Sequence, residues 1–334
     1  MARYANSVLF GFDFQSNAAI VLMIDNMADM DTIRIEGEED IEIGLNDGTY
    51  VLAQAKSVMK ASTDFANVRQ KAQKAMKSLS EAAQKRRAKQ LIYFTNSTNP
   101  FNDEASRPLF YGKARRKYSD LPDNTKVIID GWLSDIDKPL DTDLLTVQMI
   151  SFETDDDDER YKVVLEKISD FIGGLDLHLA TDGLRKKLHD VWVTMLDRNG
   201  SKSNRDITLT KKDVVWPIIV FVTYSRQLYL EGQYYQGLDE DEIEEIERRY
   251  GELIEDTSER FDIVVKVITD YGEKRQNRRD AIDWFVNDYW SDYIGEFGLD
   301  AVEEPLKSCL TKKILHAILR KKIAINSIKQ TVNL

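Results

Sequence analysis

The chain has 334 residues, with 58 acidic side chains, 46 basic side chains and a single cysteine. This length is sufficient for two domains that each bury an apolar core, and one cysteine excludes an intrachain disulfide. A formal net charge of −12 excludes a uniformly basic protein that binds nucleic acid through its overall charge.

The sequence also argues against a secreted or membrane-embedded protein. Residues 1–14 contain no basic stretch followed by an apolar run, so they do not resemble a signal peptide. The longest apolar run, residues 214–222, is interrupted by Pro217 and is far shorter than the roughly 20 residues needed to cross a bilayer. We therefore expect a soluble, cytoplasmic protein without membrane contact.

The N-terminal segment predicts a helix followed by a meander of three strands. Residues 7–30 place apolar side chains at helical spacing and carry Gln15 in the middle. Residues 33–36, 40–43 and 50–56 alternate or run apolar over short lengths, which predicts three strands. Asn46-Asp47-Gly48 is a turn signal between the second and third strands.

A basic helix and two further strands complete a predicted α/β domain. Residues 65–89 show a helical apolar stripe, whereas residues 90–95 and 126–130 are short apolar runs that predict buried strands. The order helix, three strands, helix, strand, strand predicts a central sheet flanked by helices. We assign this α/β domain to residues 1–150.

The rest of the chain predicts a mostly α-helical domain over residues 151–334. Beyond Asp141 the evidence for strands fades, and the acidic run at residues 153–159 predicts a linker or a helix entry, where carboxylates are favoured. Thr210 and Asp213 have capping-box spacing, which supports a helix start there. Apolar periodicity predicts helices at residues 161–172, 184–196, 211–230, 241–254, 261–271, 278–293 and 305–328.

Basic residues are concentrated in two stretches despite the acidic total. Residues 60–89 are strongly basic, and no acidic residue occurs from Lys307 to the end of the chain. The alternative interpretation of each stretch is a solvated helix face. Because duplex DNA is bound mainly through its phosphates, we predict four DNA-binding residues in the first stretch: Arg69, Lys71, Lys74 and Lys77.

A candidate metal site lies at one end of the predicted hairpin. Alternate side chains of a strand share a face, so Gln54 and Lys56 project together. Asp40 begins the strand that the turn folds beside them, so its carboxylate can meet both. Oxygen ligands of this kind suit Mg²⁺, or Mn²⁺ in its place, and such an ion activates water for phosphodiester hydrolysis. Lys56 can steer that water and stabilise the developing charge.

Two further positions extend this candidate site. Glu36, Glu38 and Glu39 precede Asp40, and alternation alone leaves open which of them faces the metal. We choose Glu36, because it ends an apolar strand. Gln15 can approach from the first helix. The predicted catalytic residues are Gln15, Glu36, Asp40, Gln54 and Lys56, and the predicted metal ligands are Glu36, Asp40 and Gln54. Spacing alone favours the plainer interpretation, a sheet with an exposed lysine.

Three segments in combination resemble a known nuclease family. They are Gly11-Phe12-Asp13-Phe14-Gln15, Glu36 with Glu39-Asp40-Ile41, and Gln54-Ala55-Lys56-Ser57. In this order they resemble the PD-(D/E)xK endonuclease domain that is fused to SAVED sensors in CBASS anti-phage systems and shared with the nuclease subunit of Lamassu systems. The resemblance covers about the first 130 residues. It implies a restriction-endonuclease-like fold with a central mixed sheet, and active-site roles for Gln15, Asp40, Gln54 and Lys56.

The helical second half departs from the CBASS pattern and is more similar to the nuclease subunit of Lamassu, or ABC-three-component, systems. That resemblance implies an SMC-like ATPase and a small accessory subunit as partners. It also implies an effector that cleaves double-stranded DNA and is activated as a homo-oligomer. Two other functions remain open: a catalytically silent nuclease fold that serves as a DNA-binding or assembly module, and a restriction-type endonuclease with sequence preference.

Other reactive side chains predict no additional site. His178, His189 and His316 share no ligand spacing, so a zinc site is not expected. Cys309 lies on an apolar helical stretch, which predicts a buried and inert thiol. The aromatic side chains of residues 284–293 have helical spacing, which predicts a core or an oligomer contact in preference to a base-stacking platform.

Overall fold

The chain forms two compact units. A computed structural model describes residues 2–61, 63–153, 155–175, 181–224, 260–274, 281–300, 302, 304 and 306–334, with isolated helical positions at 241, 244, 248 and 253. The first unit contains Met1–Gly174, Thr181–Ile218 and Val332–Leu334, and the second contains Leu175–Ala180 and Ile219–Thr331. The first unit therefore continues past residue 150, the predicted end of the α/β domain.

A seven-stranded mixed sheet organises the first unit. Its order is β5-β6-β4-β3-β2-β1-β7, and only the β3–β4 and β4–β6 pairs are parallel. The expected α/β class with a central mixed sheet is thus confirmed. The strands are β1 (Met30–Ile35), β2 (Ile41–Leu45), β3 (Tyr50–Lys56), β4 (Ala88–Thr95), β5 (Lys113–Lys117), β6 (Leu145–Ile150) and β7 (Leu209–Thr210).

The predicted meander is confirmed, and its register positions the candidate site. β1, β2 and β3 pair antiparallel, with Ile41 opposite Ala53. Gly48 adopts a φ of 74° in the turn between β2 and β3, a conformation that glycine reaches without steric cost. Asp40, immediately before β2, therefore lies at the same end of the hairpin as Lys56, the last residue of β3.

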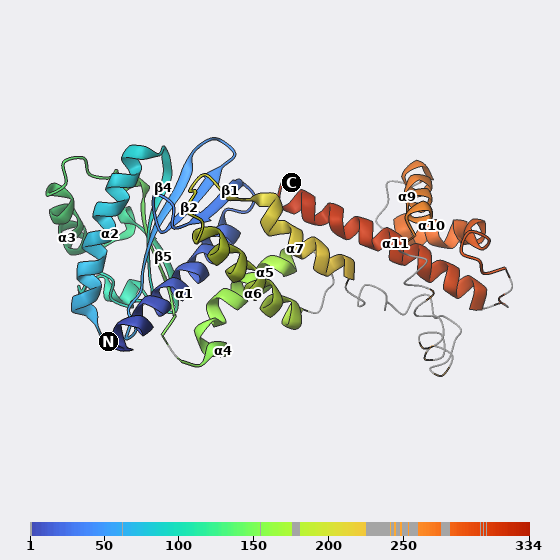
Figure 1. Cartoon of the computed structure of the whole chain (residues 1–334), viewed down its shortest axis with the longest axis horizontal. Coiled ribbons are helices and arrows are strands. Elements are labelled where there is room, and N and C mark those ends of the chain that lie inside the picture. The colour runs from blue at the N-terminus through green and yellow to red at the C-terminus, as the bar shows by residue number, and fades with distance from the viewer. Residues whose placement is uncertain are drawn as a thin grey trace. The chain divides into compact units, whose positions relative to one another are not determined.

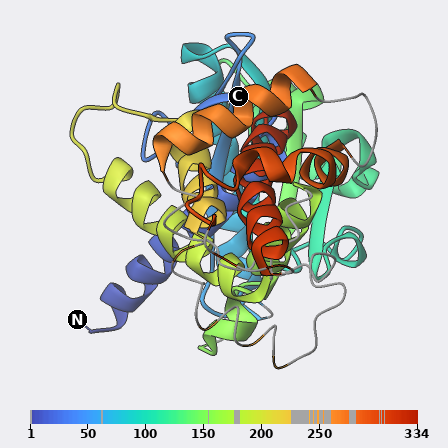
Figure 2. The same cartoon turned by 90° about the vertical axis from the view of Figure 1, so that its right-hand side faces the viewer.

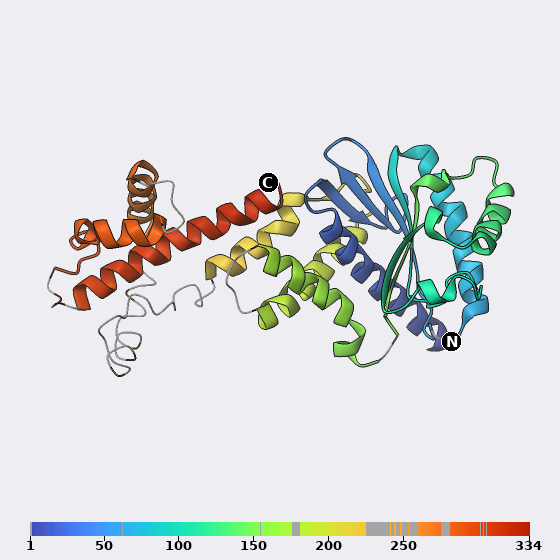
Figure 3. The same cartoon turned by 180° about the vertical axis from the view of Figure 1, so that it is seen from behind.

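Helices cover both faces of the sheet (Figures 1 and 3). On one face, α2 (Phe65–Lys85) and α3 (Asp123–Ser134) share an apolar core with Tyr93 of β4. On the other face lies α1 (Ala2–Asp25), whose Phe14 packs edge-on against Phe94 with ring centroids 5.8 Å apart. Tyr93 and Phe94 are neighbours on β4, so they project to opposite faces.

Two helices cover the outer side of α1 and extend the first unit beyond the sheet. They are α5 (Lys162–Gly174) and α6 (Thr181–Gly200), which both contact α1. Asn6–Asp25 is long and apolar enough by composition to cross a bilayer, but 61% of that window is buried inside the fold. Because α1 lies between the sheet and these helices, it is a core helix, and it indicates no membrane span.

The structure corrects two strand predictions. Residues 126–130 are not a strand but part of α3, which buries Thr125, Ile129 and Leu133 at four-residue spacing, while Val127 is 70% exposed. β5 was not predicted, and β6 and β7 lie beyond Asp141, where the sequence predicts no further strand. β6 is instead buried at all six positions, between β4 and the charged edge strand β5.

Two helices of the first unit begin at acidic residues, as predicted. Asp156 caps α4 (Asp157–Arg160) by accepting hydrogen bonds from the backbone N–H groups of residues 158 and 159, at 3.0 and 3.3 Å. Thr210 and Asp213 form the predicted reciprocal cap of α7 (Lys211–Tyr224), with bonds of 2.7 to 3.2 Å. Residues 156–159 of the acidic run therefore form a helix entry.

The described part of the second unit is helical. It contains the end of α7 from Ile219 onward, α9 (Phe261–Lys274), α10 (Ala281–Tyr289), the short helix η6 (Trp290–Tyr293) and α11 (Leu306–Thr331). Figure 2 shows α9 lying across α11. Phe285 and Tyr293 are buried, which confirms the core interpretation of the aromatic segment, and Cys309 is buried as predicted. Predicted helical residues 225–230, His178 and most of residues 241–254 lie outside the described residues.

Candidate functional site

The candidate site is centred on Asp40, which contacts two of the other predicted residues. Its carboxylate Oδ2 accepts hydrogen bonds from Lys56 Nζ and from the backbone N–H of Ala55, each at 2.9 Å. Its backbone carbonyl accepts a bond of 2.7 Å from Nε2 of Gln15 on α1. The Lys56 and Asp40 side chains are 29% and 20% exposed, so the site opens to solvent.

Gln54 lies two positions before Lys56 on β3 and is only 3% exposed. Ala53 before it pairs with Ile41 of β2, and Gln54 itself pairs with Tyr93 of β4. The alternation of a strand places Gln54 on the Lys56 face. Strand register therefore brings Gln54 to the end of the sheet that holds Asp40, with its amide beneath the surface.

Among the three glutamates before Asp40, the structure brings Glu39 to the site in place of the predicted Glu36. Glu36 is exposed, has a φ of 56°, and closes the β1–β2 turn by donating its backbone N–H to the Asp40 carbonyl. Glu38 forms an ion pair of 2.6 Å with Lys85, which lowers the pKa of Glu38. Glu36 is thus a turn residue, because β1 ends one position before it.

Glu39 is the buried carboxyl group of this segment. It is 6% exposed, and burial, together with the adjacent negative charge of Asp40, raises the pKa of Glu39 to about 8. Its Oε2 atom has no hydrogen-bond partner. A buried acceptor without a donor lowers the stability of the fold by about 1–3 kcal/mol. Binding of a proton or a cation to this oxygen would remove that cost.

The four predicted DNA-binding residues of α2 occupy different environments. Lys71 donates a hydrogen bond from Nζ to the carbonyl of Ser57, the residue after Lys56. Burial, and then the positive charge of Lys56, lowers the pKa of Lys71. Arg69 instead lies 6.0 Å from the centroid of the Trp132 ring. Lys74 and Lys77 are exposed. Lys71 alone of the four therefore contacts the candidate site.

Asn96, which was not among the predicted site residues, joins the strand ends behind the site. Its Oδ1 accepts the Val58 N–H at 2.9 Å, and its Nδ2 donates to the carbonyls of Val58 and Phe152 at 2.8 and 2.6 Å. These bonds join the segments that follow β3, β4 and β6. A polar run, Thr95-Asn96-Ser97, directly after an apolar strand is the signal that would have identified it.

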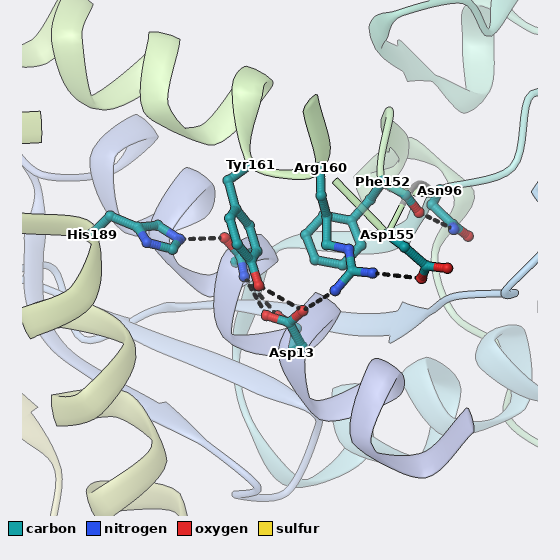
Figure 4. Close-up of polar contacts among 8 residues, drawn as sticks. Asp13, Asn96, Phe152, Asp155, Arg160, Tyr161 and His189 are labelled. Carbon is teal, nitrogen blue, oxygen red and sulfur yellow. Dashed lines mark hydrogen bonds and ion pairs between the residues drawn. The ribbon is translucent and has the colours of Figure 1, made fainter. Parts of the chain in front are cut away.

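A polar network anchors the other side of α1 (Figure 4). Asp13 accepts a 3.1 Å hydrogen bond from the Tyr161 hydroxyl and lies 3.5 Å from Arg160. Asn17, one turn further along α1, bonds through Oδ1 to Nε2 of His189 at 2.8 Å. Burial raises the pKa of Asp13 despite these partners, and burial with the charge of Asp13 raises the pKa of Tyr161 to about 12.

This network has a structural consequence for the candidate site. Asp13 and Asn17 connect α1 to the helical segment after the sheet, while Gln15 between them contacts Asp40. In the sequence, Asp13 stands out only as part of the motif Gly11-Phe12-Asp13-Phe14-Gln15. His189 is 7% exposed, as a satisfied core histidine should be.

Three residues at this end of the sheet carry oxygen atoms of the kind that a hard cation prefers. Glu39 and Asp40 are adjacent carboxyl groups, Gln54 has a buried amide, and the buried Oε2 atom of Glu39 has no hydrogen-bond partner. Within the described residues, no group of three or more histidine, cysteine, aspartate or glutamate side chains could hold a metal ion. Any cation here would thus depend on the amide and on backbone oxygens or water as well as the two carboxylates.

Comparison of the chain with known protein families, with curated protein sequences and with solved structures finds no match.

Proposed function

We propose that the chain is a Mg²⁺-dependent endonuclease that cleaves double-stranded DNA. The observation that carries the proposal is that Asp40 accepts hydrogen bonds from both Lys56 and Gln15. The adjacent residue, Glu39, has a buried carboxyl oxygen without a hydrogen-bond partner. Asp40, Glu39 and Gln54 are the residues that would hold Mg²⁺, or Mn²⁺ in its place. A divalent cation there supplies stabilisation of phosphate charge and a water of lowered pKa.

The protein side chains have separate roles in this proposal. Lys56 holds a non-bridging phosphate oxygen or orients the attacking water, because its ammonium group lies at the open edge of the site, 2.9 Å from Asp40. Gln15 fixes the backbone of Asp40. The exposed basic residues of α2 hold the phosphates of the duplex outside the site.

A plasmid assay tests this function. Purified protein is incubated with supercoiled plasmid in Mg²⁺, in Mn²⁺ and in EDTA, and Lys56→Met is run in parallel. We expect nicked and linear products only with the parent protein and a divalent cation. Conversion by Lys56→Met at the parent rate would remove Lys56 from the active site, and conversion in EDTA would remove the metal requirement.

A catalytically silent module is the second candidate, and one observation favours it. The Lys56 ammonium already occupies Oδ2 of Asp40, an oxygen that a cation would need. A silent module would bind duplex DNA with the affinity that its basic residues provide, and neither Mg²⁺ nor Lys56→Met would produce a change in the plasmid. A restriction-type enzyme is distinguished by mapping the cut sites on one plasmid, since it cuts at repeated sequences.

The biological setting of the proposal rests on the sequence resemblance. We propose a cytoplasmic effector of an anti-phage complex, restrained by an SMC-like ATPase and a small accessory subunit and activated as a homo-oligomer. One site of this kind cleaves one strand at a time, so two copies are needed for a concerted double-strand break, and symmetric pairing is the commonest assembly. Light scattering alongside cleavage across a concentration series tests this; a monomer that makes double-strand breaks linearly with concentration would contradict it.

A further inference from the structure

A groove of about 570 Å³ lies beside α2, and none of the predicted catalytic residues lines it. Its walls come from α2 and from the end of α3 with the segment that follows, residues 132–138. This volume is within the range of small-molecule sites, about 300–1,000 Å³. Lys74 and Lys77, two of the four predicted DNA-binding residues, line this groove.

The charges lining the groove are mixed. Three lysines, Lys74, Lys77 and Lys138, face three carboxylates, Glu81, Asp135 and Asp137. Lys77 and Glu81 form only a 4.0 Å contact, with side chains 71% and 62% exposed, so each is available to a ligand. Because the formal charges cancel, the groove does not favour a simple anion. It suits a ligand with both an anionic group and hydrogen-bond donors.

One wall of the groove is aromatic. Trp132 lines the groove, and Phe101, with a ring centroid 6.3 Å away, and the Arg69 guanidinium, at 6.0 Å, hold its ring. Gln73 and Gln84 contribute amides from α2. An indole, amides and carboxylates for a base, together with ammonium groups for a phosphate, are the chemistry that recognises an unpaired nucleotide.

A line of lysines connects the groove with the candidate active site. Lys71, whose Nζ bonds to the Ser57 carbonyl, is three residues before Lys74, and Lys74 is three residues before Lys77. Side chains three apart on a helix have Cβ atoms about 5–6 Å apart. The charges of Lys56 and Lys74 both act on Lys71. Successive cations therefore follow α2 from the sheet edge into the groove.

We infer that the groove between α2 and residues 132–138 binds one unpaired nucleotide of a DNA strand that continues along α2 to the candidate site. The inference rests on the proposed function in taking DNA as the ligand, but it does not require cleavage. It assigns a preferred form of substrate: a duplex with a single-stranded extension or a frayed end.

Fluorescence anisotropy with labelled DNA in EDTA tests the inference independently of catalysis. The full chain is titrated into a blunt duplex and into the same duplex with a short single-stranded extension. We expect the extended duplex to bind at least about fivefold more tightly, because stacking of one base on an aromatic side chain is worth about 1–3 kcal/mol. Equal affinity of the parent protein for both DNAs overturns the inference.

Three variants test whether the groove causes the preference for the extended duplex. Trp132→Leu removes the aromatic wall, and Lys138→Ala changes an exposed groove residue outside the apolar core. In each variant the ratio of the affinity for the extended duplex to the affinity for the blunt duplex should fall toward one. The affinity for the blunt duplex itself should stay nearly unchanged. Lys113→Ala, on the exposed edge strand β5, is the matched control and should retain the preference. A preference that survives both groove variants overturns the inference. A preference in this titration, together with no cleavage in the plasmid assay with Mg²⁺, supports the inference and contradicts the nuclease proposal.

Discussion

Lys56 and Asp40 form an ion pair in which Nζ lies 2.9 Å from Oδ2, at the open end of the β2–β3 hairpin. Lys56 therefore acts as the counter-ion of the carboxylate in the absence of a ligand. The same contact makes Lys56 a competitor of any cation at Asp40, because one oxygen cannot accept both closely.

The first prediction uses that competition. Lys56→Met removes the ammonium group and keeps much of the side-chain volume, so we expect Mg²⁺ to bind several-fold more tightly while plasmid cleavage falls by at least about a hundredfold. Isothermal titration calorimetry measures the Mg²⁺ affinity. Unchanged Mg²⁺ affinity in Lys56→Met would place the cation away from Asp40, and weaker binding would contradict the competition.

The second prediction separates two glutamates that are three residues apart. Glu39→Gln replaces the buried carboxyl group whose Oε2 is unpartnered, so the affinity for Mg²⁺ should fall by about tenfold or more. Glu36→Gln is the matched control, because Glu36 is exposed in the turn, and it should bind Mg²⁺ like the parent. The same calorimetric titration measures both variants. The opposite pattern would restore the original prediction of Glu36 as the ligand.

The third prediction separates Lys71 from the other lysines of α2. Lys71→Met should reduce the cleavage rate at saturating DNA by about tenfold or more, because Lys71 contacts the segment that follows Lys56. Lys77→Met should weaken DNA binding and flatten its salt dependence, with little change in the saturated rate. Single-turnover cleavage with excess protein measures the rate, and a binding titration at several salt concentrations measures the slope. Equal effects of both variants on the saturated rate would contradict the distinction.

The fourth prediction concerns the network behind α1. Tyr161→Phe removes the hydroxyl that donates to Asp13, so the free energy of unfolding of the first unit should fall by about 1 kcal/mol. Tyr118→Phe is the control, since its bond to Asp130 is exposed and should contribute less. Urea unfolding gives the free energies, and hydrogen exchange locates the loss in α1 and in α5, which Tyr161 immediately precedes. A larger loss from Tyr118→Phe would contradict this account.

The fifth prediction is a pH dependence in the second unit. Burial of Lys313 on α11 lowers the pKa of its ammonium group to about 8, against 10.5 in the unfolded chain. Between these values the unfolded chain holds a proton that the folded chain lacks, so stability rises with pH across this window. At lower pH the buried charge is destabilising throughout. Lys313→Met should remove the rise, which melting curves from about pH 7 to pH 10 measure; identical slopes for both proteins would contradict the assignment.

The sequence alone was sufficient to predict the β1–β3 meander. It was also sufficient to predict that Gln54 and Lys56 lie on the same face of β3. These features depend on local chemistry: a period of two along a strand, and a turn at Asn46-Asp47-Gly48, where Thr49 N donates to Asp47 Oδ1 at 2.9 Å. The proximity of Asp40 to Lys56 follows from that register. The cap of α7 by Thr210 and Asp213 was also predictable, because both partners lie within four residues.

Tertiary structure decided what local periodicity could not. Residues 126–130 contain β-branched side chains that favour a strand, but packing against the sheet needs only one face of this segment, and it forms a helix that leaves Val127 exposed. β5 is almost entirely charged and is a strand because β6 supplies its hydrogen bonds. The turn conformation, in which φ at Glu36 is 56°, leaves Glu36 exposed and buries Glu39 beside Asp40. Burial, which raises the pKa of Glu39, arises only when distant segments enclose the site.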